Sequence, residues 1–360
     1  MDSLETYMSR LTGSAARRSA FRADRPFGEW RETLVRRLRE RLGGFPDTPA
    51  DLRPALLEDT DCGEYRRQRI EITTYDGLRM PVYMLFPRRL PPGPAPAVLA
   101  IHGHGYGSRE IVGLHPDGSE RRGDPGLHRD FAVSLARRGF VVAAPELLGF
   151  GDRRLAEDLA LAEEEPGRNS CFRLSSALLT IGQTMAGYRI YETMRAVDYV
   201  QSREEADGGR IGIMGISGGG LVAGFTAALD ERIRCAVVSG YANTFVASIL
   251  ARQHCLDNYI PGILLEAEMP DLLGLIAPRG LFLECGVRDH LFGPAAAREA
   301  LERLREIYRA AGRPGGVEAD VFDGGHEIHG EPAFAWLRRQ LELPDRDPHG
   351  EEVGKKETRS

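Results

Sequence analysis

Apolar and polar positions follow a helical spacing at the start of this chain. One apolar stripe recurs every fourth residue among arginines, and Gly43 and Pro46 end it. The stripe consists of Trp30, Leu34, Leu38 and Leu42. It favours a helix packed on a main domain, with a dimer contact or a lid over a pocket as alternatives. We therefore expect a helical extension over residues 1–60.

From residue 66 the pattern becomes that of strands alternating with helices. Two runs flank Tyr75-Asp76-Gly77, a hairpin signal. Strands are predicted at 69–73, 80–86, 97–101, 140–144, 210–216, 236–239, 280–286 and 317–322, and helices at 131–138, 190–200 and 295–311, with a closing helix at Trp336 and Leu337. This alternation predicts a doubly wound α/β sheet, whose ligand site lies beyond the carboxyl ends of the strands.

The same pattern sets the expected domain boundaries. Residues 61–343 form one catalytic domain. Residues 146–183 have no clear period and follow a strand end, so we expect this insertion to cover the substrate pocket. The charged tail at 344–360 is expected to be disordered.

A strand, a sharp turn and a helix are predicted at residues 210–229. Between the strand and the helix lies G-x-S-x-G, with Gly215 and Gly219 two residues either side of Ser217. Small residues suit a nucleophile turn, because its backbone packs against the neighbouring strand and helix. Such a turn exposes the Ser217 hydroxyl, and the N–H of Gly218 points towards a reacting carbonyl. The alternative is a glycine-rich turn that binds a phosphate or only turns the chain.

An acid and a histidine follow Ser217 at the ends of later predicted strands. Asp289 comes directly after one strand and His326 lies on the turn after the last. The order Ser, Asp, His is that of the α/β-hydrolases. We expect His326 to take the hydroxyl proton and Asp289 to hold the imidazole in the required tautomer. His329 is the rival base, and Asp323 and Asp271 are rival acids.

The loop after the strand at 97–101 contains His102-Gly103-His104. It is similar to the H-G-x turn that supplies a second oxyanion donor, which here is the backbone N–H of His104. The two histidines also match a metal-binding H-x-H pair, but no third ligand follows at a telling spacing. His326-Glu327-Ile328-His329 is one residue short of a zinc-protease helix. We therefore expect neither a metal nor a cofactor.

Several of these motifs resemble the dienelactone hydrolase and acetyl xylan esterase branch of the α/β-hydrolases, over roughly residues 66–340. The matching segments are 102–105, 196–200, 215–219, 276–279 and 324–326. The resemblance implies an eight-stranded, mostly parallel sheet, a covalent acyl-enzyme and no cofactor. Dienelactone hydrolases use a cysteine nucleophile where Ser217 stands. Carbohydrate deacetylases often carry glutamine where Gly218 stands, so neither substrate class follows from the resemblance.

Composition narrows the classes of partner and the cellular location that the sequence allows. The 360 residues are 42% hydrophobic and 28% charged, and a net charge of −6 argues against nucleic acid as a partner. No apolar run is long enough to span a bilayer and the start of the chain is polar, so we expect a cytoplasmic protein with no membrane partner. The five widely spaced cysteines indicate buried reduced thiols.

The function predicted from the sequence is that of a serine hydrolase acting on a small carboxylic ester, with a homodimer as one expected arrangement. The candidates for pocket walls are Tyr106, Phe150, Tyr188 and Tyr259. Amide or peptide cleavage, or acyl transfer, would use the same three residues. A non-catalytic binding protein on this fold is a further alternative, although such proteins usually lack a triad member.

Overall fold

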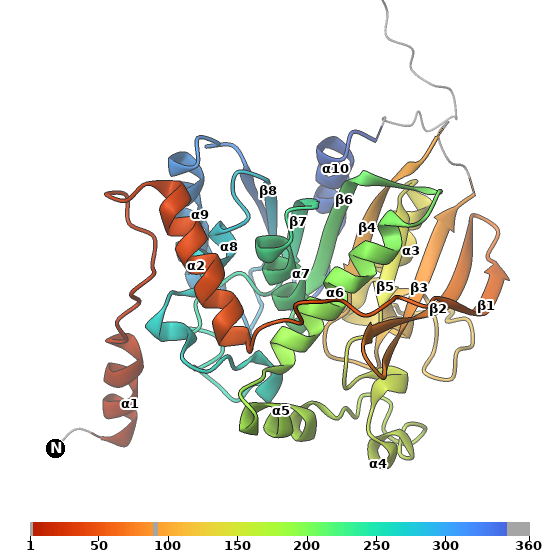
Figure 1. Ribbon diagram of the computed structural model, residues 1–360, viewed down its shortest axis with the longest axis horizontal. Helices are drawn as coiled ribbons and strands as arrows, with labels where there is room; N and C mark the ends of the chain where they lie inside the picture. The colour runs from red at the N-terminus through yellow and green to blue at the C-terminus, as the bar shows by residue number, and fades with distance from the viewer. Residues whose placement is uncertain (1–2, 89–92, 344–360) are drawn as a thin grey trace, which may run out of the picture.

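A central sheet with helices on both faces organises the protein (Figure 1). The computed structural model describes residues 3–88 and 93–343, so the tail expected at 344–360 lies outside the described residues. In spatial order the strands are β1 (Ala55–Asp61), β2 (Tyr65–Tyr75), β3 (Leu78–Pro87), β5 (Val141–Pro145), β4 (Ala95–Ile101), β6 (Ala206–Ile216), β7 (Ile233–Ser239), β8 (Gly280–Gly286) and β9 (Val317–Phe322). The pairs β1–β2, β2–β3 and β3–β5 are antiparallel. The remaining neighbours, from β5 through β4 and β6 to β9, pair parallel.

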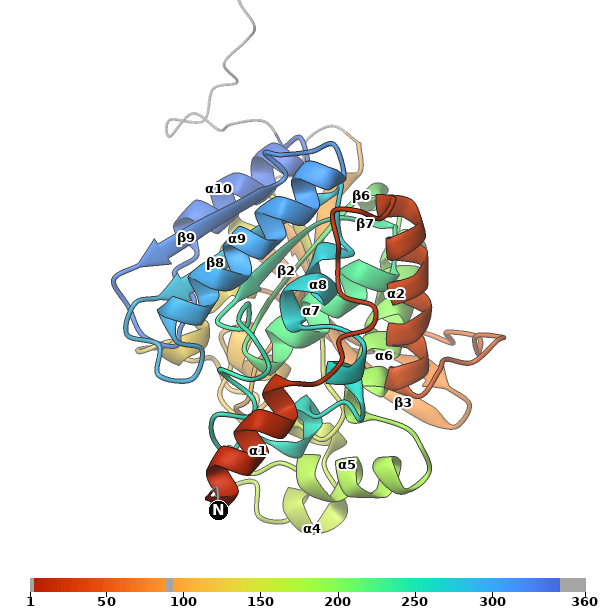
Figure 2. The same ribbon diagram turned by 90° about the vertical axis from the view of Figure 1, so that its left-hand side faces the viewer.

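The helices form two layers, one on each face of the sheet (Figure 2). One layer contains α2 (Phe27–Leu42), α6 (Met185–Gln201), α7 (Gly218–Leu229), α8 (Met269–Gly274) and α9 (Pro294–Ala310). The other contains α3 (Phe131–Arg137) and α10 (Glu331–Gln340). Along β4, Leu99 packs into the first layer and Val98 into the second. A strand buried on both faces reads as a continuous apolar run, which is why the sequence predicted it.

The start of the chain is helical, as expected, but also contains a strand. Helix α1 (Leu4–Gly13) buries none of its residues, whereas the stripe from Trp30 to Leu42 on α2 is buried. The Arg31 guanidinium donates to the Leu275 carbonyl at 3.0 Å, and α2 contacts α6. Helix α2 therefore packs on the main domain, and its buried stripe is not free to form a dimer contact or a lid.

The sheet has nine strands, whereas the sequence predicted eight, and β1 is the additional strand. It lies at the edge of the sheet and all its residues are exposed. No alternating apolar face marks it in the sequence, because neither face is covered. The segment expected to be helical up to residue 60 therefore ends in a strand.

The insertion after β5 folds into two short helices, α4 (Ala156–Leu159) and α5 (Cys171–Thr180). Helix α5 contacts α6 and the 3₁₀ helix η4 (Leu256–Asn258). The other 3₁₀ helices are η1 (Ser108–Ile111), η2 (Gly126–His128), η3 (Gly151–Arg153) and η5 (Ile263–Leu265). Among the residues that the structure describes, no helix combines the length and the apolar character needed to cross a bilayer.

The register of the parallel strands aligns their carboxyl ends. Ile101 lies opposite Gly215, and Ile216 lies opposite Ser239. Further along the sheet, Gly286 lies opposite Phe322. The segments that follow β4, β6, β7, β8 and β9 therefore leave from one edge of the sheet, and all the sequence-predicted catalytic residues lie on them.

Candidate active site

Ser217 occupies the turn between β6 and α7, with φ at 58° and ψ at −128°. A left-handed backbone is strained in a residue other than glycine, and it persists only where the surroundings hold it. A Cβ at Gly215 would clash with the Gly219 carbonyl, and a Cβ at Gly219 with the His102 carbonyl. The Ser217 N–H donates to the Ser239 carbonyl at 2.9 Å. The turn is thus fixed against its neighbours, with the serine side chain partly exposed.

Asp289 and His326 meet across the ends of β8 and β9. The Nδ1 atom of His326 lies 2.8 Å from Oδ2 of Asp289. The other carboxylate oxygen of Asp289 accepts the backbone N–H groups of Leu291 at 2.8 Å and Phe292 at 2.9 Å. Burial opposes ionisation of Asp289, but the hydrogen bond from His326 and these N–H groups lower the pKa of the carboxyl. The pair therefore holds an ionised acid against an imidazole.

The residue after β7 brings this pair towards the nucleophile turn. Gly240 has φ at +52°, and a Cβ on it would lie 3.0 Å from the ring of His326. Its neighbour Ser239 accepts the N–H of Ser217. The His326 imidazole and the Ser217 backbone thus contact two adjacent residues, Gly240 and Ser239, at the end of β7. Ser217 Oγ forms no hydrogen bond to another described residue, and catalytic hydrogen bonds often tighten only when substrate binds.

The rival residues have other partners. His329 is exposed and pairs with Asp320 at 2.5 Å. Asp323 is exposed and forms an ion pair with Arg288. Asp271 completes the capping box at the start of α8. None of these contacts involves the turn at Ser217.

The loop after β4 packs against the nucleophile turn. A Cβ at Gly103 would lie 2.8 Å from the Ile216 carbonyl oxygen and 3.2 Å from Cβ of Ser217. The ring of His104 lies against Gly218, 3.2 Å from where its Cβ would stand. Within the described chain, neither the His104 N–H nor the Gly218 N–H donates a hydrogen bond. Two uncommitted backbone donors therefore lie close to the serine, and their role in an oxyanion hole stays a prediction.

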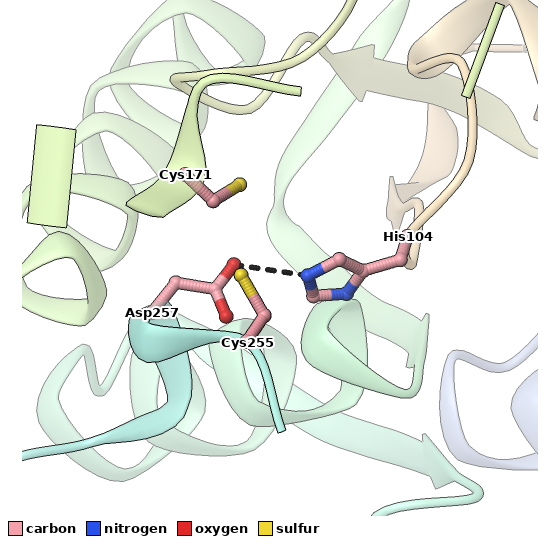
Figure 3. A group of neighbouring side chains, drawn as sticks. All are labelled: His104, Cys171, Cys255 and Asp257. Atoms are coloured by element: carbon pink, nitrogen blue, oxygen red, sulfur yellow. Dashed lines mark ion pairs between the residues drawn. The ribbon is translucent and has the colours of Figure 1, made fainter. Parts of the chain in front are cut away.

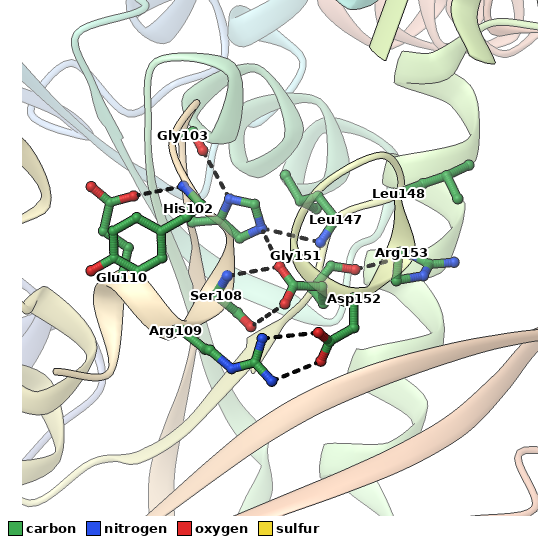
Figure 4. A network of polar contacts seen from close by, with 12 residues as sticks. His102, Gly103, Ser108, Arg109, Glu110, Leu147, Leu148, Gly151, Asp152 and Arg153 are labelled. Carbon is green, nitrogen blue, oxygen red and sulfur yellow. Dashed lines mark hydrogen bonds and ion pairs between the residues drawn. The ribbon is translucent and has the colours of Figure 1, made fainter. Parts of the chain in front are cut away.

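A buried polar network holds this loop from behind (Figure 4). His102 Nδ1 donates to the Gly103 carbonyl at 2.8 Å, and its Nε2 accepts the Leu147 N–H at 3.1 Å. The Glu146 carboxylate accepts the N–H and the hydroxyl of Ser108 at 2.8 and 3.0 Å. Both ring nitrogens of His102 are thus hydrogen-bonded to backbone groups, of Gly103 and Leu147, so His102 does not form a metal-binding pair with His104.

Two residues that hold the loop after β4, His128 and Glu146, were not predicted from the sequence. The N–H of Gly103 donates to Nε2 of His128 at 2.9 Å, and burial lowers the pKa of that imidazole, which leaves it neutral and able to accept. No motif surrounds His128. Glu146 offered a signal, since it is an acid directly after a buried strand, the position that also marked Asp289.

A second aspartate–histidine pair lies on the far side of Gly218. Nε2 of His104 is 3.2 Å from the Asp257 carboxylate, which also binds Arg189 at 2.5 Å. Burial lowers the basicity of His104, but the Asp257 charge outweighs it and raises the pKa to about 9. The thiols of Cys171 and Cys255 lie beside this pair. The sequence predicted only the backbone of His104, and this side-chain cluster was missed.

Two of the four aromatic residues expected in the pocket lie beside the site. Phe150 is buried, and its ring lies edge-on to those of His102 and His104, at centroid distances of 5.3 and 5.1 Å. Tyr106 donates its hydroxyl to the Leu114 carbonyl at 2.9 Å. Their contact with substrate stays a prediction.

The other two predicted pocket residues, Tyr188 and Tyr259, have different neighbours, and their contact with substrate also stays a prediction. Tyr188 on α6 stacks on Tyr75 at the end of β2, at a centroid distance of 4.7 Å. Tyr259 donates its hydroxyl to the Ile249 carbonyl at 3.2 Å and lines an apolar cavity of about 230 Å³. Leu179 of α5 is one of its lining residues, so the insertion forms part of this cavity's wall, and its role over a substrate pocket stays a prediction.

A protein family matches most of this chain. Residues 5–322 match the Abhydrolase family. The chain belongs to that family. The match confirms the α/β-hydrolase superfamily and fold predicted from the sequence.

Individual relatives of this Abhydrolase member agree with the assignment. YtaP of Bacillus subtilis (strain 168), which bears the provisional name of a hydrolase, is 31% identical over 284 residues, covering 75% of this chain and 85% of YtaP. BF1801 of Bacteroides fragilis NCTC 9343, provisionally named an acetyl xylan esterase, superposes with a TM-score of 0.79 at 20% identity and covers 95% of both chains. A glucuronoyl esterase from Solibacter usitatus gives a TM-score of 0.64 at 17% identity, over 87% of this chain and 92% of its own. At these identities the two structures show the shared fold.

Proposed function

We propose that the protein is a serine hydrolase that cleaves a small carboxylic ester through an acyl-enzyme. The observation that carries the proposal is the 2.8 Å contact between His326 and Asp289, held beside the strained turn of Ser217. Strain at a nucleophile turn and an ionised acid behind an imidazole are the features that activate a serine hydroxyl. The hydrolase and esterase names of the relatives support the same reaction class.

Each residue has a distinct role in the proposed reaction. Ser217 Oγ attacks the ester carbonyl while the Nε2 atom of His326 takes its proton, and the imidazolium then returns that proton to the leaving alcohol. Asp289 binds Nδ1–H, so Nε2 is the free base. A water molecule, deprotonated by His326, then attacks the carbonyl of the acyl-enzyme. The bond to Ser217 Oγ breaks, the serine regains its proton from the imidazolium, and the carboxylic acid is released.

The charge that develops on the carbonyl oxygen is stabilised by the backbone. The N–H groups of His104 and Gly218 have no other acceptor within the described residues. Helix α7 begins at Gly218, so its positive end faces the same position. Losing one such donor typically costs about 10²- to 10³-fold in turnover.

The cavity beside Tyr259 supports a small substrate. It measures about 230 Å³ and its lining is mainly apolar, with Phe245, Ile249 and Ile260 among the walls. This volume is below the range of about 300–1,000 Å³ that holds drug-sized ligands. None of its walls is Ser217, Asp289 or His326, and we propose it as the site of a short acyl chain or a small alcohol on its size and apolar lining.

The test is substitution of the nucleophile. Ser217→Ala should lower kcat for p-nitrophenyl acetate by about 10⁶-fold and abolish labelling by a fluorophosphonate probe. Ser202→Ala, at an exposed serine after α6, is the matched control and should keep both. Wild-type turnover in Ser217→Ala, or a probe adduct on another serine, would remove the proposal. A panel of matched esters, amides and acceptor amines then separates ester hydrolysis from amide cleavage and acyl transfer.

A further inference from the structure

Four potential metal ligands from three separate segments converge beside the loop that follows β4. They are His104 after β4, Cys171 at the start of α5, and Cys255 and Asp257 at η4. Their ligand atoms all lie within 4.8 Å of one another, and in Figure 3 the side chains point towards a common centre. We propose that these residues bind one zinc ion. The proposal does not depend on the esterase assignment.

The chemistry of the four side chains fits zinc. Zinc is held tetrahedrally by thiolate, imidazole and carboxylate groups, at about 2.3 Å for sulfur and about 2.0–2.2 Å for nitrogen and oxygen. These bond lengths place ligand atoms about 3.3–3.8 Å apart in a tetrahedron. Contraction of the longest separation from 4.8 Å by about 1.0–1.5 Å therefore completes the site. Two soft sulfurs with one nitrogen disfavour magnesium and calcium, which prefer oxygen ligands.

An unsatisfied atom points into the cluster. Nε2 of His104 is buried and has no hydrogen-bond partner among the described residues, although the Asp257 carboxylate lies 3.2 Å away in an ion-pair contact. A buried polar atom without a partner is uncommon in folded proteins, and such an atom often binds an ion. Coordination through Nε2 would satisfy it.

The two thiols are available for coordination. Cys171 and Cys255 are both free cysteines, the first buried and the second partly buried. Cysteine binds zinc as the thiolate and histidine through an unprotonated ring nitrogen, so zinc binding would release protons from the site.

Arg189 balances the charge of the loaded site. Its guanidinium is buried and donates to Asp257 at 2.5 Å and to the sulfur of Cys171 at 3.1 Å. With zinc bound, two thiolates and one carboxylate face the ion and this guanidinium, so the cluster as a whole is neutral. Hydrogen bonds of this kind orient ligands and tune their basicity.

The zinc would connect the loop that follows β4 to the insertion at residues 146–183. All four positions are filled by protein ligands, the pattern of a structural site, so the ion is not proposed as a Lewis acid. Coordination of His104 holds the residue whose N–H is the predicted oxyanion donor. Coordination of Cys171 holds the first turn of α5, whose residue Leu179 lines the apolar cavity.

Metal binding to the purified full-length chain tests this inference. Protein reduced and stripped with a chelator is titrated with Zn²⁺ against a competing chromophoric chelator, and Co²⁺ is added separately to record the visible absorption of tetrahedral thiolate coordination. We expect one zinc per chain and the cobalt bands. Cys171→Ser and Cys255→Ser should each weaken binding by more than about 100-fold, the upper range for loss of an outer-shell partner.

Two controls make the result specific. Cys62→Ser alters a half-buried free thiol in the turn after β1 and should bind zinc like the wild type. Ser217→Ala should also bind zinc normally, which separates this inference from the esterase assignment. Equal zinc affinity in wild type and Cys255→Ser would overturn the proposal, as would a reduced wild-type protein that binds no Zn²⁺.

Discussion

Two aspartate–histidine pairs flank the nucleophile turn, and they differ in what surrounds them. His326 meets Asp289 through Nδ1 at 2.8 Å, whereas His104 meets Asp257 through Nε2 at 3.2 Å. The first contact leaves Nε2 of His326 free to accept a proton. The second is an ion-pair contact without a hydrogen bond, and it places Nε2 of His104 beside two thiols.

The environment of each carboxylate explains the difference. Asp289 is held by two backbone N–H groups, which are neutral, so the field at His326 comes from one carboxylate. Asp257 is held by the Arg189 guanidinium and faces the two sulfurs as well as His104. The same pair of residue types therefore suits proton transfer in one place and ion binding in the other, because roles follow surroundings.

The largest expected contrast is between amide substitutions of the two acids. Asp289→Asn should lower kcat by about 10⁴-fold, because an amide favours the wrong tautomer of His326. Asp257→Asn should lower kcat far less, because its contact is with the His104 side chain and the predicted oxyanion donor is the backbone. Ester turnover measured below the unfolding transition of each variant provides the comparison. Similar losses in both variants would show that the two pairs are not distinct in role.

A backbone substitution tests how finely the first pair is placed. Gly240→Ala puts a Cβ 3.0 Å from the His326 ring at φ +52° and should slow turnover by about 10²-fold, the typical cost of a displacement near 1 Å. Gly312→Ala is the control, since Gly312 has φ +74° and nothing within 4 Å. Both variants should lose stability from the left-handed backbone. If the two variants turn over ester equally fast, Gly240 does not position the imidazole.

A further buried acid, Glu284 on β8, predicts a pH dependence of stability. Glu284 on β8 accepts the Ser239 hydroxyl at 2.5 Å and the Gly330 N–H at 2.7 Å. Burial raises the pKa of Glu284 above 4.5, because the charged form is poorly solvated. A raised folded-state pKa gives stability that is complete below the unfolded value and is lost as pH rises through the folded value.

Glu284→Gln should remove that slope. In wild type the free energy of unfolding should decline as pH rises above 4.5, by up to about 1.4 kcal/mol per pH unit for one proton. The amide keeps both contacts without titrating, so its stability curve should be flatter over the same range. Urea unfolding at a series of pH values measures both. Parallel curves for the two proteins would mean that Glu284 ionises normally.

The sequence predicted the parts of the site that local patterns encode. The strained turn needs small residues around Ser217, and an acid and a histidine directly after strands reach the same edge of the sheet, so motif and chain order were sufficient to nominate Asp289 and His326. Strand β1 was missed because its exposed residues carry no periodicity.

The second pair could not be predicted in the same way. Cys171 lies in an insertion without a period and Cys255 in a loop-rich stretch, so nothing in their spacing indicates that they meet. Only the packing of α5 against η4 brings them to His104. Chain-distant ligands on irregular segments therefore require the fold, whereas ligands on a single helix can be read from spacing.

The smallest expected effect concerns an aromatic residue next to Arg189 in the chain. Tyr188 was predicted to line the pocket, but its ring stacks on Tyr75 at 4.7 Å and so packs at the end of β2. Tyr188→Leu should therefore change KM by less than about twofold while lowering stability by about 1 kcal/mol, the value of an aromatic pair. Phe150→Leu is the matched variant, because Phe150 touches the ring of His104 at 5.1 Å and should change ester turnover and zinc affinity together. A large rise in KM for Tyr188→Leu with unchanged stability would instead place Tyr188 against the substrate.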